Sequence, residues 1–126
     1  MSEELHVPVT SFNEDIRERT KQAALRVIRL SEQLPTCKEA FVLGKQVLRS
    51  ATSVAANFRA SCRSRSSAEW YSKLCICVEE ADETIFWLEL IGDANMMPKS
   101  RLAGLENEYR EILAILASTR KRAKSK

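Results

Sequence analysis

The chain has 126 residues, of which 44% are hydrophobic and 29% charged, and its formal net charge at pH 7 is +3. These values are typical of one globular domain, because a chain of this length is too short for two hydrophobic cores. Only three glycines and three prolines occur, which is few for a β-sheet protein and favours an all-helical one. No apolar run reaches the roughly 20 residues of a bilayer-spanning helix, and residues 1–15 do not resemble a signal peptide, so we expect no membrane association and a cytoplasmic location.

Two helices are predicted in the first half of the chain, after an arm at residues 1–12 that shows no periodicity. Asn13 is the expected cap of the first helix, which should run to about Leu34. The inner face of this helix is predicted at Ile16, Ala23, Val27, Leu30 and Leu34. The tetrapeptide Thr36-Cys37-Lys38-Glu39 has the pattern of a capping box, so the second helix should begin there and run to about Ser61.

The second helix carries two parallel stripes of residues. Its apolar stripe recurs at steps of three and four and faces the core at Val47, Ala51, Val54 and Phe58. Its polar stripe lies about a quarter turn away, at Gln46, Arg49, Ser53 and Asn57. We expect the polar stripe to meet two carboxylates of the third helix in an inter-helix polar cluster of Arg49, Ser53, Asn57, Glu80 and Glu83. Such clusters more often fix helix register than perform chemistry.

Gly44, in the same helix, is either a tolerated glycine, the simpler interpretation, or a point of close helix contact.

A short basic turn, Cys62-Arg63-Ser64-Arg65, leads into the third helix. The next four residues, Ser66-Ser67-Ala68-Glu69, match a capping box, in which a serine hydroxyl and the Glu69 carboxylate accept hydrogen bonds from free backbone amides. The core face of this helix has near-heptad spacing, at Trp70, Leu74, Cys77, Ala81, Ile85, Leu88 and Ile91. Gly92 and Asn95 suit a helix end near Asp93.

The fourth helix should begin near Pro98, and its core stripe is predicted at Leu102, Leu105, Tyr109, Ile112 and Leu116. Three short connections between four helices of similar length make neighbouring helices antiparallel. The predicted fold is therefore all-α, an antiparallel up-down four-helix bundle over residues 13–120. A basic tail at residues 121–126 follows it.

The residues around the second turn also carry a family resemblance. It rests on residues 46–60 (QVLRSATSVAANFRA), on Arg63 with Arg65 and Ser66, and on residues 80–90 (EADETIFWLEL). Over roughly residues 12–120 the chain resembles the four-helix-bundle family that is also called the 23S rRNA intervening-sequence protein family. That resemblance implies a bundle assembled as a homopentameric ring, with a basic surface and no established enzymatic activity. The chain is also similar to the accessory protein of diversity-generating retroelements, which implies a reverse transcriptase and RNA as partners.

The third helix carries more apolar surface than one core requires. Phe86 and Leu90 project roughly opposite the core face, and Trp87 lies to one flank. Because an exposed hydrophobic patch of this kind on a monomer would promote association, we interpret Phe86, Trp87 and Leu90 as an oligomer interface. The alternative is that a neighbouring helix of the same chain covers them.

Charge is unevenly distributed around the third helix. The basic residues gather near the second turn, and we predict that they bind nucleic acid through its phosphates: Arg59, Arg63, Arg65 and Lys73. Acidic residues accumulate further along, with no basic residue between Leu74 and Pro98. The alternative interpretation of such a charge cluster is a solvated surface. No aromatic residues interleave the arginines, which argues against sequence-specific recognition of single strands.

Catalytic and metal-binding patterns are absent from the sequence. Its one histidine, His6, lies in the arm, and there is no glycine-rich phosphate loop. The four cysteines are expected to be free thiols, because the chain needs no disulfides and Cys75 and Cys77 would point about 160° apart on a helix. We therefore expect no catalytic residue, no metal and no cofactor.

The sequence thus favours a non-enzymatic oligomeric bundle that acts as a nucleic-acid-binding or scaffold protein, with RNA or a ribonucleoprotein as the best candidate partner. The alternative is a protein-interaction adaptor whose acidic third helix docks a basic partner.

Overall fold

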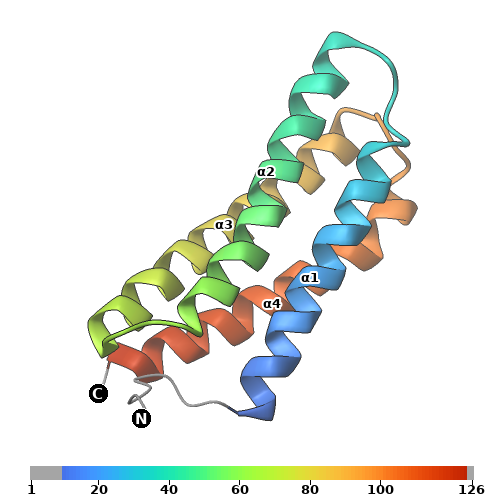
Figure 1. The fold of residues 1–126 in the computed structure, drawn as a ribbon. Helices are drawn as coiled ribbons and strands as arrows, with labels where there is room; N and C mark the ends of the chain where they lie inside the picture. Colours follow the sequence, from blue (N-terminus) through green and yellow to red (C-terminus); the bar gives the residue numbers. More distant parts are fainter. Residues whose placement is uncertain (1–9, 125–126) are drawn as a thin grey trace.

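The computed structural model of the protein describes residues 10–124, and all regular structure within that range is helical. The helices are α1 (Ser11–Ser31), α2 (Lys38–Ser61), α3 (Ser67–Asp93) and α4 (Lys99–Lys124). Successive helices run antiparallel and lie side by side in an elongated up-down bundle (Figure 1). The predicted all-α four-helix bundle is confirmed, and α2 and α3 form its most extensive helix pair. No helix in the described range is long and apolar enough to span a bilayer.

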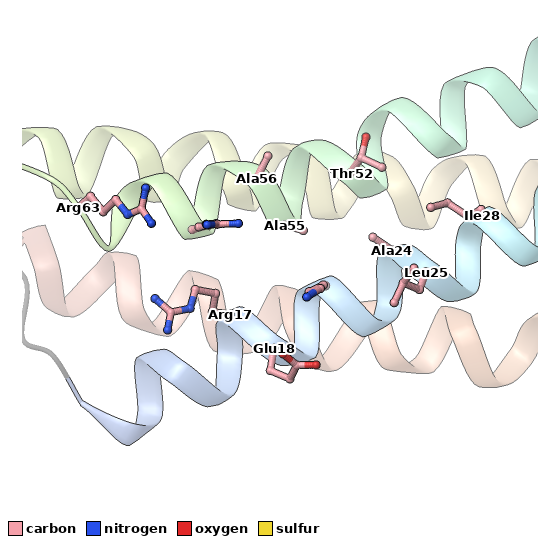
Figure 2. Close-up of a pocket in the computed structure, with 11 residues that line it drawn as sticks. Arg17, Glu18, Ala24, Leu25, Ile28, Thr52, Ala55, Ala56 and Arg63 are labelled. Carbon is pink, nitrogen blue, oxygen red and sulfur yellow. The ribbon is translucent and has the colours of Figure 1, made fainter.

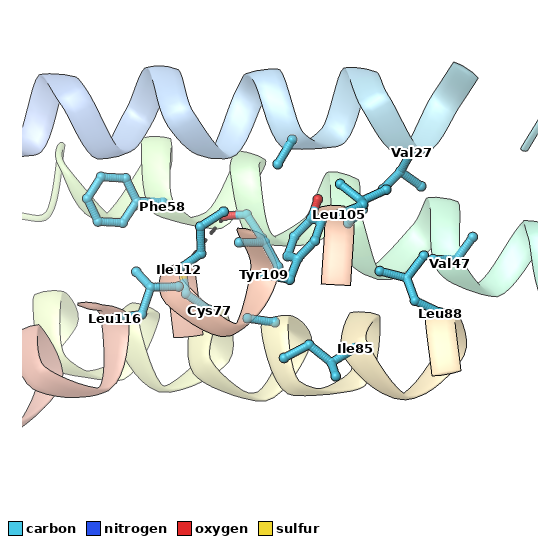
Figure 3. Close-up of a cluster of buried hydrophobic side chains, with 14 of the residues drawn as sticks. Val27, Val47, Phe58, Cys77, Ile85, Leu88, Leu105, Tyr109, Ile112 and Leu116 are labelled. Atoms are coloured by element: carbon cyan, nitrogen blue, oxygen red, sulfur yellow. Dashed lines mark hydrogen bonds between the residues drawn. The ribbon is translucent and has the colours of Figure 1, made fainter. Parts of the chain in front are cut away.

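The core lies along the bundle axis, where each of these helices contributes a buried stripe (Figure 3). Val27, Val47, Phe58 and Leu88 are completely shielded from solvent, and the predicted stripes of α2, α3 and α4 are buried throughout. The predicted stripe of α1 is buried except for Leu34, which is half-buried beyond the end of the helix. Periodicity identified the core because apolar residues three and four positions apart share one helix face.

Both ends of α1 differ from the sequence prediction. The helix begins about one turn earlier, because the Thr10 side chain accepts a hydrogen bond from the backbone N–H of Asn13 at 3.1 Å. Asn13 is therefore not the cap, but lies inside the helix and is buried. The helix ends at Ser31 rather than near Leu34, and a short turn connects it to α2.

The bundle extends further toward both termini than predicted. α1 includes residues 11 and 12 of the expected arm, and α4 includes residues 121–124 of the expected tail. Basic side chains at residues 121–124 interact favourably with the negative end of the helix dipole, which favours helix there. Residues 1–9, with His6, and residues 125–126 lie outside the described residues.

The two predicted capping boxes have different outcomes. Cys37 occupies the cap position of α2 and its side chain makes no cap hydrogen bond, so the box predicted at Thr36 is wrong. Thr36 lies one residue before the cap position, and a cysteine sulfur is only a weak acceptor. At the start of α3, the Ser66 hydroxyl accepts a hydrogen bond from the backbone N–H of Glu69 at 3.0 Å. The Glu69 carboxylate in turn accepts one at 2.7 Å from the backbone N–H of Arg65, the residue before the cap. Both predicted acceptors therefore satisfy free backbone amides, although the carboxylate reaches one residue beyond the N–H of the cap itself.

The end of α3 is a left-handed turn at Asn95, whose φ is 60°. The backbone N–H of Met96 donates to the carbonyl of Ile91 at 3.1 Å, and that of Asn95 donates to the carbonyl of Gly92 at 3.0 Å. These two bonds form a Schellman motif, and asparagine is one of the few residues besides glycine that tolerate its left-handed position. The predicted role of Asn95 at the helix end is confirmed.

Gly44 marks a close approach between α2 and the segment that follows α1. A Cβ atom at this position would lie 3.0 Å from Cδ1 of Leu34, which is closer than ordinary van der Waals contact. The neighbouring atom is the end of a leucine side chain in the turn after α1 and not part of a helix, so the contact leaves both interpretations of Gly44 open.

Candidate nucleic-acid interface

One side of the bundle, between α1 and α2, is hollowed into a groove with a volume of about 570 Å³. Its floor is apolar and consists of Ala24, Leu25, Ile28, Ala55 and Ala56. Its polar lining consists of Arg17, Glu18, Lys21, Thr52, Arg59 and Arg63. We name it the α1–α2 groove; small alanine side chains on both helices leave this space open.

Four cations gather toward one end of the groove, which we name the cationic end. Arg17 and Lys21 are four residues apart on α1, so they lie on one helix face. Arg59 lies in the last turn of α2, and Arg63 lies in the turn that follows. Figure 2 shows Arg17 and Arg63 on opposite sides of the cationic end, while Ile28 lies at the other end of the groove.

The cationic end is not neutralised by ion pairs among the residues described. Within residues 10–124, none of its four cations forms an ion pair. Glu18, which also lines the groove, accepts a hydrogen bond from the side-chain amide of Gln22 at 2.8 Å. The neighbouring Arg19, by contrast, is paired with Glu108 at 2.6 Å. Four cations against the one carboxylate of Glu18 leave an excess of positive charge at the cationic end, which would attract an anion.

The structure brings together only some of the residues predicted to contact phosphates. Arg59 and Arg63 line the α1–α2 groove, whereas Arg65 and Lys73 do not. Arg65 is almost fully exposed and makes a long ion pair with Glu69, at 3.6 Å. Lys73 lies on α3 and forms no ion pair among the residues described.

Arg17 and Lys21 belong to the site, but the sequence analysis missed them. They reach Arg59 and Arg63 only because α1 and α2 are antiparallel neighbours, so that the first turns of α1 lie beside the last turns of α2 (Figure 1). The predicted up-down topology already implies that the start of the first helix lies beside the end of the second, so these two residues could have been included in the site.

Arg49 lies between α2 and α3 beside two carboxylates. Its guanidinium donates to Glu80 at 3.1 Å and also contacts Glu83. Ser53 and Asn57 bond to each other instead, with the Asn57 side-chain amide donating to Ser53 Oγ at 2.9 Å. The structure thus divides the predicted inter-helix polar cluster into two separate parts.

A buried hydroxyl pair, which the sequence analysis also missed, joins the same two helices. Thr84 Oγ1 lies 2.8 Å from Ser50 Oγ, and both residues are completely buried. Thr84 stands next to the predicted core residue Ile85, and its burial is acceptable because its hydroxyl has two partners, Ser50 Oγ and the backbone carbonyl of Glu80, each at 2.8 Å.

The outward side of α3 carries apolar side chains that are partly open to solvent, among exposed carboxylates. Phe86 is 50% exposed and Ile76 38% exposed, whereas Trp87 and Leu90 are half-buried. The Trp87 ring packs edge-on against Phe86, and its Nε1 donates to Glu83 at 3.3 Å. Among the residues predicted to form the oligomer interface, Phe86 is therefore the one that no helix of the described chain covers.

The potential metal ligands and the thiols of the described residues lie apart from one another. Within residues 10–124, no three His, Cys, Asp or Glu side chains are grouped so that they could hold a metal ion. All four cysteines are free thiols. Burial raises the pKa of Cys77 to about 12, so its thiol stays protonated and unreactive at neutral pH.

Comparison with known proteins places these features in a family. A family described as 23S rRNA-intervening sequence protein matches residues 13–118. Among solved structures, the chain is similar to a protein of unknown function from the S23 ribosomal protein family of Bacteroides thetaiotaomicron VPI-5482. The two sequences are 32% identical, the TM-score is 0.81, and the match covers 86% of this chain and 97% of that one. A search of curated proteins finds no match.

Proposed function

The chain belongs to the 23S rRNA-intervening sequence protein family, and from this premise we propose that it is a non-enzymatic, oligomeric protein that binds nucleic acid, with RNA or a ribonucleoprotein as the preferred partner. Because the related solved protein has an unknown function, the proposal rests on the residues of this chain. The observation that carries it is the cationic end, where four basic side chains share one concave site without ion-pair partners among the residues described.

Cations that form no ion pair and lie in a concave site are suited to binding phosphates. Their summed potential attracts a polyanion, and binding releases the counterions that surround the nucleic acid. Three of the four cations are arginines, whose planar guanidinium groups match phosphate oxygens. The apolar floor offers no side-chain groups to hydrogen-bond base edges, so we expect binding that depends strongly on salt and weakly on sequence. Arg65 and Lys73 would add contacts outside the groove.

We further propose that the protein is an oligomer, with a homopentameric ring as the favoured order, assembled through Phe86, Trp87 and Leu90. The half-exposed Phe86 supports this proposal, because an aromatic ring on the surface of a monomer favours burial against a partner. Repetition of the cationic end around a ring would multiply the number of phosphates that each assembly binds.

Replacement of Arg59, Arg63 and Arg65 by alanine tests the binding of phosphates. We expect weaker RNA binding and a shallower dependence of log K on log salt, measured by fluorescence anisotropy. The slope should fall by about 0.7–0.9 for each phosphate that the variant no longer neutralises.

The control variant replaces three cations of α4, namely Lys99, Arg101 and Arg110. Because both variants have three fewer positive charges, a difference between them reports position rather than net charge. If the arginine variant has the same affinity and salt slope as wild type, Arg59, Arg63 and Arg65 are not part of the binding site.

A protein-interaction adaptor is the second candidate function. The supporting observation is that Glu79 and Asp82 are exposed on α3 and form no ion pair within the described part of the chain. A basic partner could dock against these carboxylates, and oligomerisation would make the binding multivalent. A partner protein that stays bound in pull-downs after nuclease treatment, but no longer binds the Glu79→Lys variant, would favour the adaptor.

A further inference from the structure

The α1–α2 groove is divided along its length into a charged part and an apolar part. Arg17 and Arg63 flank one end, and Ile28 and Thr52 lie toward the other (Figure 2). Ile28 follows Arg17 by eleven residues on α1, which corresponds to about 16 Å along the helix axis. The apolar floor therefore occupies the part of the groove that the cations leave free.

The apolar floor is open to solvent because its side chains are small. On α2 the floor consists of Ala55 and Ala56, whose methyl groups are too short to fill the space beside α1. On α1, Ile28 is 36% exposed. Apolar surface in a concave site is stabilised when a ligand removes it from water.

The floor and the cations are close enough to contact one nucleotide together. Ala24 follows Lys21 by three residues on α1, and Ala56 precedes Arg59 by three residues on α2. Three residues span about 4.5 Å along a helix axis. A nucleotide joins its phosphate to its base through a single sugar, so the phosphate can lie among the cations while the base covers the floor.

We infer that the α1–α2 groove binds an unpaired nucleotide of single-stranded RNA, with the phosphate at the cationic end and the base on the apolar floor. The inference rests on the nucleic-acid binding proposed above and names the form of RNA that the site selects. Two packed helices lie about 8–10 Å apart, so the groove between them admits a single base but not a double helix. A single strand can turn an unstacked base onto the floor, whereas a duplex keeps its bases paired inside.

The contact with the floor does not depend on the type of base. The floor has aliphatic side chains only, and these pack against the flat face that every base possesses. Thr52 borders the floor, but its hydroxyl already donates to the backbone carbonyl of Leu48 at 2.8 Å, so this hydrogen is not free to bond a base edge. We expect the base to add affinity without adding sequence preference.

Charge alone predicts a different preference. A duplex has a higher density of phosphates than a single strand, and its binding to cations depends more steeply on salt. A site that recognised phosphates only would therefore prefer the duplex, whereas contact with a base favours the single strand. The preference between the two forms of RNA thus reports on the floor.

Fluorescence anisotropy with three RNA ligands tests the inference: a single strand, the same strand annealed to its complement, and a strand of equal length built from abasic nucleotides. The abasic strand keeps every phosphate but has no base to cover the floor. Wild type is compared with a groove-filling variant, Ala55→Leu with Ala56→Leu. The matched control is Ala103→Leu with Ala114→Leu, which changes two exposed alanines of α4 outside the groove. Circular dichroism and thermal melting check that the variants are folded.

We expect wild type to bind the single strand more tightly than the duplex. It should bind the abasic strand about fivefold more weakly than the intact strand, which is the lower end of what the stacking of one base contributes. The salt slope should be the same for the intact and abasic strands, because their phosphates are identical. The groove-filling variant should bind both strands alike, because its leucines occupy the floor, and the α4 control should behave as wild type.

Four results would overturn the inference, and they separate it from the function proposed above. Equal affinity of wild type for the intact and abasic strands excludes contact with the base but leaves phosphate binding in place. A duplex that binds as tightly as the single strand excludes selection of unpaired nucleotides. A groove-filling variant that still prefers the intact strand over the abasic one places the contact outside the groove. Absence of binding to all three ligands excludes the proposed function and the inference with it.

If the groove-filling variant does not fold, Ala56→Leu alone replaces it, because Ala56 is exposed. The abasic strand tests the contact with the base in wild type, whatever the outcome for the variants.

Discussion

Tyr109 is the largest completely buried side chain among the described residues, and its hydroxyl has no hydrogen-bond partner there. Leu105 and Ile112 lie beside it in the core (Figure 3), and burial raises the pKa of the phenol well above its usual range. An unsatisfied buried hydroxyl costs roughly 1–3 kcal/mol. We expect Tyr109→Phe to raise the free energy of unfolding by about 1 kcal/mol, measured by urea denaturation. Tyr71→Phe, at a half-buried tyrosine, is the control; a loss of stability in Tyr109→Phe would show that the hydroxyl is bonded in solution.

Arg19 and Glu108 join α1 to α4 through two hydrogen bonds, at 2.6 and 2.9 Å. The bonds from Arg19 hold the pKa of Glu108 below its ordinary value. A carboxylate whose pKa is lower in the folded state stabilises the fold above its unfolded pKa, and this contribution is lost as pH falls through the folded pKa. The stability of wild type should therefore decline between about pH 5 and pH 3.

The Glu108→Gln variant separates this contribution from general acid denaturation. We expect it to be less stable than wild type at neutral pH by up to about 1 kcal/mol and to decline less steeply in acid, in urea denaturation at a series of pH values. Glu32→Gln, at an exposed residue without an ion pair in the described structure, should follow wild type. If the free energy of unfolding of wild type and of Glu108→Gln falls with pH in parallel, the Arg19–Glu108 pair does not contribute to the acid sensitivity of the fold.

At the scale of the helix, the start of α3 depends on one serine. The Ser66 hydroxyl satisfies the backbone N–H of Glu69, and Ser67, the next residue, is exposed inside the first turn. We expect Ser66→Ala to lower the free energy of unfolding by about 1 kcal/mol, and Ser67→Ala to change it little. Thermal melting of both variants measures the difference; equal melting temperatures would mean that Ser66 does not cap the helix in solution.

The interiors of the helices could be predicted from the sequence, whereas some of their ends could not. Core residues recur at three and four positions, and this pattern spans many residues, so a single exception such as Leu34 does not obscure it. An end depends on one or two polar side chains, and near α1 both Thr10 and Asn13 suit a cap. Only the geometry of the chain decides between them.

At the scale of the whole molecule, the candidate site could be predicted only in part. Arg59 and Arg63 stand out because they cluster near one turn of the sequence. Arg17 and Lys21 come from another helix and join them through the antiparallel packing of α1 and α2. The groove itself depends on where small side chains of two helices face each other, which periodicity within one helix does not reveal.

The packing of α1 also determines where the groove forms. α1 packs more closely on α2 than on α4, yet small alanines such as Ala24 and Ala55 leave their shared outer edge hollow. Arg19 ties α1 to α4 on the other side through Glu108. The bundle thus separates a neutralised edge from the cationic end, and this separation is the basis of the proposed function.

The decisive measurement is binding of the purified protein to RNA at several salt concentrations, with its oligomer mass measured by light scattering in the same buffers. We expect micromolar or tighter binding at low salt, with a linear decline of log K against log salt and little dependence on RNA sequence. A stable oligomer that binds no RNA at low salt would contradict nucleic-acid binding at the cationic end.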